Sequence, residues 1–95
     1  MTERQTTDAQ LIERAATHAT VKQWTDDSKK LLSGRTIQHV RYMTKKEVEY
    51  MGWQSRSVII ILDNGVAIYP SRDDEGNDAG ALFTSDDSLP IIPVI

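Results

Sequence analysis

The chain contains no cysteine, few aromatic residues and no long hydrophobic run. The lack of cysteine excludes disulfides, thiolate zinc sites and cysteine nucleophiles. The longest apolar run, Val58 to Leu62, is far too short to span a bilayer, and the polar residues at the start do not resemble a signal peptide. We therefore expect a cytoplasmic protein that does not enter a membrane.

The 95 residues predict one small domain, residues 1–95, with a modest hydrophobic core. Residues 1–6 are polar and are expected to be disordered. Thr7 and Gln10 then form a capping-box pattern that predicts the start of a helix. An alanine-rich apolar stripe follows at helical spacing and is a candidate contact surface. Its residues are Leu11, Ile12, Ala15, Ala16 and Ala19.

The apolar residues that come next change sides of the helix. Trp24 and Leu31 fall nearly opposite the alanine-rich stripe on an ideal helix. This change predicts a break between Thr20 and Thr25, followed by a second short helix over residues 26–32. One long helix over residues 8–32 is the alternative that the boundary signals leave open.

Three strands and one short helix are predicted downstream, which gives an α+β fold with a three-stranded antiparallel meander. The strands cover about residues 35–43, 57–62 and 66–69. A bulge near Gln38 and His39 is expected, because it brings the apolar residues of the first strand to one side. Thr44 and Glu47 form a capping box for a helix over residues 45–51, and Asn64-Gly65 predicts a hairpin turn.

The run Val58 to Leu62 has no alternation, so it is placed centrally with both faces covered. In so short a chain, cover for the second face must come from the apolar, extended tail at residues 89–95 or from a second subunit. This requirement predicts a homodimer or another protein partner. Ile91, Ile92 and Val94 are the candidate interface residues of the tail.

Charge is distributed unevenly along the chain. Net charge is −2 over residues 1–28, +5 over residues 29–56 and −6 over residues 57–95. The basic middle favours nucleic-acid binding as an alternative function. Its candidate residues are Lys29, Lys30, Arg35, Arg41, Lys45, Lys46 and Arg56. The acidity of the last third argues against a uniform nucleic-acid surface, so this alternative is not favoured.

The acidic loop after the hairpin suggests another alternative, a site for calcium or magnesium. Its candidate ligands are Asp73, Glu75, Asn77 and Asp78. The spacing departs from a calcium-binding EF-hand loop, because Asp78 stands where a glycine belongs and Thr84 stands where a glutamate belongs. The competing interpretation is that the loop is shaped for turn geometry by Asp74, Gly76, Asn77 and Gly80.

No nucleophile elbow, phosphate-binding loop or pair of metal-ligating histidines is present, so we expect no enzymatic activity and no cofactor. The segments Gly34–Thr44, Met51–Arg56 and Pro70–Phe83 together resemble a group of short, uncharacterised bacterial proteins. The resemblance covers about residues 34–95 and implies no activity, cofactor or partner. The function predicted here is a small binding domain that associates with itself.

Overall fold

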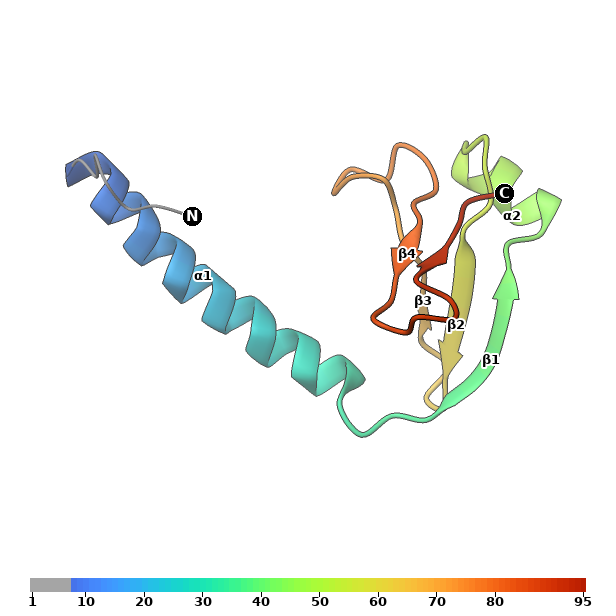
Figure 1. Ribbon diagram of the computed structural model, residues 1–95, viewed down its shortest axis with the longest axis horizontal. Helices are drawn as coiled ribbons and strands as arrows, with labels where there is room; N and C mark the ends of the chain where they lie inside the picture. The colour runs from blue at the N-terminus through green and yellow to red at the C-terminus, as the bar shows by residue number, and fades with distance from the viewer. Residues whose placement is uncertain (1–7) are drawn as a thin grey trace. The chain divides into compact units, whose positions relative to one another are not determined.

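The computed structural model describes residues 8–95, and the side chains of residues 19–95. The chain divides into two compact units, Met1–Gly34 and Arg35–Ile95, and each is described by itself (Figure 1). The predicted disorder of residues 1–6 and the predicted cap at Thr7 lie outside the described residues. The prediction of a single domain stays a prediction. The fold is α+β, as the sequence predicts.

The N-terminal unit contains one helix, α1, which spans Asp8–Leu32 without interruption. The predicted break between Thr20 and Thr25 is therefore wrong, and the alternative of one long helix is confirmed. The physical reason is local. No glycine or proline occurs between residues 8 and 32, so every residue can continue the helix. A change in the position of the apolar stripe alters what the helix can contact, but it does not interrupt backbone hydrogen bonding.

The second unit, Arg35–Ile95, which we call the domain, holds the remaining elements. They are β1 (Ile37–Tyr42), α2 (Lys45–Met51), β2 (Val58–Leu62), β3 (Ala67–Ile68), β4 (Leu82–Phe83) and β5 (Ile91–Ile92). The first three strands form an antiparallel sheet in the order β1-β2-β3, which confirms the predicted meander with β2 at its centre. β4 and β5 form a separate two-stranded sheet that the sequence did not predict.

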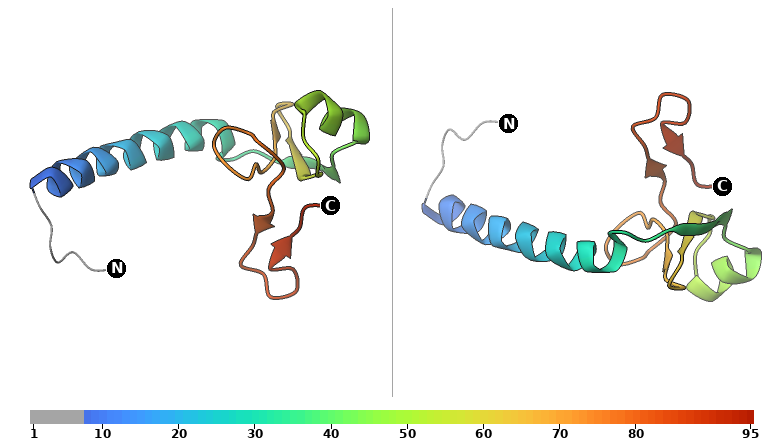
Figure 2. Two further views of the ribbon diagram at one scale, coloured as in Figure 1. Left: turned by 90° about the horizontal axis from the view of Figure 1, so that it is seen from above. Right: turned by 90° about the horizontal axis from the view of Figure 1, so that it is seen from below.

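The register of β1 against β2 shifts between Ile37 and His39, which confirms the predicted bulge. Ile37, Val40 and Tyr42 pair with Leu62, Ile60 and Val58, so these six residues share one face of the sheet. His39 and Arg41 pair with Ile61 and Ile59 on the opposite face. Figure 2 shows that α2 lies on one side of this sheet and that β4 and β5 project from the other side.

The capping box of α2 forms as predicted. Glu47 N–H donates to Thr44 Oγ1 at 3.2 Å, and Thr44 N–H donates to Glu47 Oε1 at 2.8 Å. Gly52 ends the helix with φ +74°, in the left-handed region that glycine adopts readily. The chain is then directed back toward the sheet, which brings Trp53 into the core.

The core lies between the sheet, α2 and the loop that follows β3. It consists of Met43, Val48, Trp53, Ile59 and Ala79, with the half-buried Met51 and Ile61 packed against it. The hydroxyl of Ser57 is completely buried and donates to the sulfur of Met43 at 3.4 Å. This hydrogen bond meets the usual requirement that a buried polar group has a partner.

The C-terminal segment crosses the other face of the sheet. Tyr42 Oη–H donates to the carbonyl of Pro93 at 2.7 Å. Arg56 and Ile95 exchange two backbone hydrogen bonds, of 2.8 and 3.0 Å. The apolar tail thus covers the end of this face near Val58, whereas Val40 in the middle of β1 remains 59% exposed.

Candidate functional site

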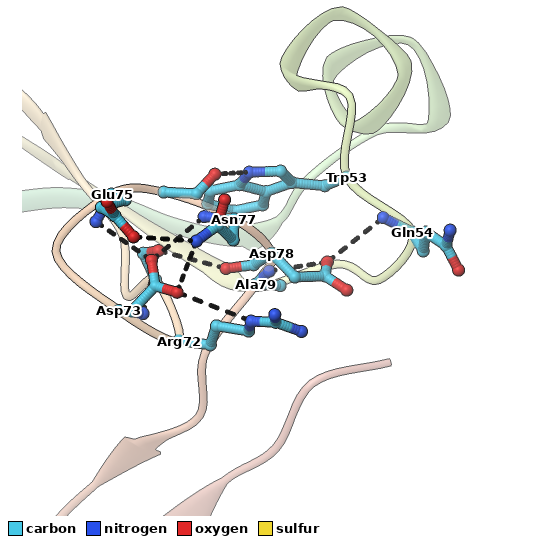
Figure 3. A network of polar contacts seen from close by, with 10 residues as sticks. Trp53, Gln54, Arg72, Asp73, Glu75, Asn77, Asp78 and Ala79 are labelled. Carbon is cyan, nitrogen blue, oxygen red and sulfur yellow. Dashed lines mark hydrogen bonds and ion pairs between the residues drawn. The ribbon is translucent and has the colours of Figure 1, made fainter.

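The acidic loop, residues 71–80, is organised by two of its own carboxylates (Figure 3). Asp73 Oδ1 accepts hydrogen bonds from the N–H groups of Glu75 and Asn77, at 3.0 and 3.2 Å. Its second oxygen accepts one from the amide of Asn77 at 2.7 Å. The hydrogen bond from the Asn77 side chain is the main cause that lowers the pKa of Asp73. These bonds hold the carboxylate within its own turn.

Asp78 is directed to a different part of the domain. One oxygen, Oδ1, accepts hydrogen bonds from the N–H groups of Ala79, Gln54 and Ser55, at 2.8, 3.1 and 3.2 Å. The bond from Ala79 is the largest of the causes that lower the pKa of Asp78. Asp78 therefore connects the acidic loop to the turn between α2 and β2.

Trp53 completes this connection. Its side chain is only 6% exposed, and its indole N–H donates to the carbonyl of Gly76 at 2.6 Å. The ring also contacts Tyr69 edge to face, with centroids 6.0 Å apart. Trp53 packs α2 onto the sheet, and the same side chain also holds the acidic loop in place.

The predicted metal ligands are thus already engaged in hydrogen bonds. Asp73, Glu75 and Asn77 bond one another within the loop, whereas Asp78 bonds the turn between α2 and β2. Within the described residues, no group of three or more histidine, aspartate or glutamate side chains is arranged to hold a metal ion. The geometry favours the interpretation that the loop residues shape a turn. Metal binding stays a prediction that these contacts do not support.

The predicted nucleic-acid residues occur in both units. Lys29 and Lys30 lie in the last turn of α1, whereas the other five belong to the domain. Arg41 forms a bidentate pair with Glu47, with N–O distances of 2.8 and 2.9 Å. This pair is the main cause that lowers the pKa of Glu47 to about 2. The charge of Arg41 is therefore neutralised locally, which weakens the case for a phosphate contact there.

The predicted interface residues also belong to both units. The side chains of residues 11–16 lie outside the described part, whereas Ala19 is exposed on α1. In the tail, Ile91 pairs with Phe83 in the β4–β5 ladder and both are exposed, while Ile92 pairs with Leu82 and both are half-buried. Val94 is exposed next to the segment that bonds Arg56.

The structure also contains an apolar groove that sequence reasoning missed. It lies on the α2 side of the sheet and has a volume of about 400 Å³. Met43, Met51, Ile59, Ile61 and Tyr69 supply most of its apolar lining, while Arg41, Lys46 and Tyr50 also border it. The sequence signal was present but indirect. β2 is apolar on both faces, and a helix of seven residues is too short to cover a whole sheet face.

Comparisons with known proteins found no relatives: no protein-family model matches the chain, and no curated protein or solved structure does so either. The resemblance of residues 34–95 to short bacterial proteins stays a prediction. In the described part of the chain, no helix has both the length and the hydropathy needed to cross a membrane.

Proposed function

We propose that this protein is a non-enzymatic binding domain that associates with a second copy of itself, and that α1 supplies the contact surface. The observation that carries the proposal is the exposure of α1. Every described side chain of this helix, from residue 19 to residue 32, is exposed. They include Trp24, which is 63% exposed, together with Val21 and Leu31.

A helix of this kind needs a partner for physical reasons. Helices in proteins derive most of their stability from packing of an apolar face, because local propensity alone is marginal in water. Over residues 19–32, the structure provides one ion pair within the helix, between Lys22 and Asp26 at 2.8 Å. An exposed pair at this spacing contributes only about 0.2–0.5 kcal/mol. Burial of Trp24 and Leu31 against another chain supplies the missing stabilisation.

The domain adds exposed apolar surface of its own. In the domain, seven apolar side chains are buried, whereas nine large apolar side chains are exposed. Single exposed apolar residues are normal, but so many on so short a chain favour an interaction surface. The cytoplasmic location expected from the sequence forms part of this proposal.

Sedimentation velocity at micromolar concentration tests the proposal, and the expected result is a dimer. Trp24→Ala should raise the dissociation constant about 30-fold or more, because buried tryptophans are typical hot spots worth 2 kcal/mol or more. Lys29→Ala, on the other side of α1, is the control and should leave the dissociation constant nearly unchanged. A monomer for the unmodified protein at these concentrations contradicts the proposal.

A further inference from the structure

From the groove and the exposed helix we infer that the α1 helix of one copy docks into the apolar groove of the domain of a second copy, with Trp24 and Leu31 as its apolar anchors and Asp27 facing Lys46. This inference rests on the proposed self-association and names the surfaces that form it. The argument uses the composition of the groove, its charge and the pattern along α1.

The groove has the composition of a protein-binding surface. Met43 and Ile59 are buried at its base, and Met51 and Ile61 are half-buried. Methionine side chains adapt their shape to a partner, and methionine and tyrosine are enriched in protein interfaces. Tyr50 borders the groove and is 91% exposed, so a docked partner would cover a large aromatic surface.

The size of the groove suits an inserted side chain. Its volume of about 400 Å³ lies at the lower end of the range of about 300–1,000 Å³ that is usual for ligand sites. A helix that lies in such a groove inserts anchors spaced by three, four or seven residues. Trp24 and Leu31 are seven residues apart on α1 and therefore lie on the same side of the helix.

The charge at the groove selects an acidic partner. Two basic side chains line it, and Glu47 already neutralises Arg41 through the bidentate pair. Lys46 has no ion pair with any described residue, so its charge is available to a partner.

The side of α1 that carries the two anchors also carries an available acid. Asp27 follows Trp24 by three residues and precedes Leu31 by four, so it lies between the anchors on the same side. Among the described residues, Asp26 is paired with Lys22, whereas no ion pair involves Asp27. An apolar-acidic-apolar side of α1 thus complements an apolar groove with one unpaired lysine.

Charge exchange provides the first test. Lys46→Asp and Asp27→Lys, each made alone, should raise the dissociation constant of the dimer roughly tenfold by placing like charges together. The double variant should return it to near the unmodified value. Lys45→Asp is the matched control, since Lys45 precedes Lys46 on α2 but does not line the groove. A double variant as weak as either single variant overturns the docking.

Disulfide cross-linking provides the second test. The chain has no cysteine of its own, so only the introduced cysteines can form a disulfide. An Asp27→Cys chain is mixed with a tagged Lys46→Cys chain and treated with an added oxidant. The expected product is a disulfide-linked pair of one chain of each kind, because docking brings these positions within the short distance that a disulfide requires. A Lys29→Cys chain replaces the Asp27→Cys chain as control, since Lys29 lies on the other side of α1, and it should not cross-link.

The outcomes distinguish the docking of α1 into the groove from the proposed self-association on which it rests. A monomeric unmodified protein overturns both. A dimer that neither cross-links at these positions nor responds to the charge exchange overturns only the docking. A chain with both Asp27→Cys and Lys46→Cys that forms an internal disulfide at high dilution overturns docking into a second copy, because α1 then occupies the groove of its own chain.

Discussion

The helix α1 and the domain Arg35–Ile95 use similar apolar residues in opposite ways. Each unit has one tryptophan. Trp24 on α1 is 63% exposed, whereas Trp53 in the domain is 6% exposed and has its N–H bonded to Gly76. Since the residue type is the same, the difference in exposure comes from the atoms that surround each ring.

The difference in exposure follows from how each unit forms its backbone hydrogen bonds. A helix forms its hydrogen bonds locally, so the backbone hydrogen bonding of α1 does not itself enclose a core. A sheet pairs residues that are distant in the sequence, and this pairing encloses a core. β2 lies between two other strands, and the acidic loop reaches Trp53 from 23 residues away. Burial in the domain is thus a product of long-range pairing, whereas the described side chains of α1, residues 19–32, remain exposed.

The largest expected effect comes from exchanging each tryptophan for alanine at a concentration low enough to keep the protein monomeric. Trp53→Ala should destabilise the domain by about 3–5 kcal/mol, since it leaves a cavity in the core. Trp24→Ala should change the stability by less than about 0.5 kcal/mol, as expected for an exposed position. Urea unfolding followed by circular dichroism measures both. Equal losses of stability would remove the contrast between the two units.

A smaller effect is expected at Gly80, the last residue of the acidic loop, which lies close to Ser71, the first residue of the same loop. A Cβ atom at position 80 would lie 2.7 Å from the backbone carbon and oxygen of Ser71. Gly80→Ala should therefore destabilise the domain by about 1–3 kcal/mol through overpacking. Ala81→Ser, at the neighbouring exposed position, is the control for urea unfolding. A Gly80→Ala variant as stable as this control would show that the two ends of the loop can move apart.

Acid should unfold the domain through its hydrogen-bonded carboxylates. Hydrogen bonding lowers the pKa of Glu47 from 4.5 to about 2, and it also lowers the pKa of Asp73 and Asp78. A lowered pKa means that the ionised group stabilises the fold above the pKa of the unfolded chain, and that this contribution is lost as pH falls through the folded-state pKa. The melting temperature should therefore be constant above about pH 5 and should fall between about pH 4.5 and 2.

Two substitutions test whether this acid sensitivity comes from the hydrogen-bonded carboxylates. Glu47→Gln and Asp78→Asn should each lower the melting temperature at pH 7 and reduce its fall at acid pH. Asp74→Asn is the control, because Asp74 is exposed and belongs to neither hydrogen-bond network. If the Asp74→Asn variant changed the acid profile as much as Asp78→Asn does, the assignment to hydrogen-bonded carboxylates would be wrong.

The smallest effect is expected within α1. Lys22→Ala removes the one ion pair within residues 19–32 and should weaken the helix by about 0.2–0.5 kcal/mol. The loss should diminish in high salt, which screens exposed charges. Gln23→Ala is the control, and helix content by circular dichroism is the measurement. A larger loss of helix content from Lys22→Ala would show that local pairing, rather than a docked partner, stabilises α1.

The sequence predicted those parts of the fold that depend on neighbouring residues. Thr44 and Glu47 form the expected capping box, and the hairpin turn at Asn64-Gly65 connects β2 to β3. The bulge in β1 was also predictable, since only a shift of register gathers its apolar residues on one side. Continuity of α1 is not predictable from its apolar stripe, because a stripe that changes sides does not interrupt backbone hydrogen bonding.

The candidate site was less predictable, because its parts come from separate segments. Nothing adjacent to Asp78 indicates that it accepts N–H groups from Gln54 and Ser55, more than 20 residues earlier. The apolar groove likewise combines β1, α2, β2 and β3. The pairing of Arg41 with Glu47 was not predicted from the sequence either. Because Arg41 is paired, Lys46 is the basic residue of the groove whose charge is not neutralised by an ion pair.

The amino-acid sequence by itself determined the capped start of α2, the hairpin turn after β2 and the bulge in β1, because capping, turn dihedrals and alternation act over a few residues. Tertiary structure alone decided which tryptophan is buried, which acids shape a loop and which lysine keeps its charge available. Those outcomes depend on atoms brought together across dozens of residues, and burial and pairing exist only once the sheet has formed.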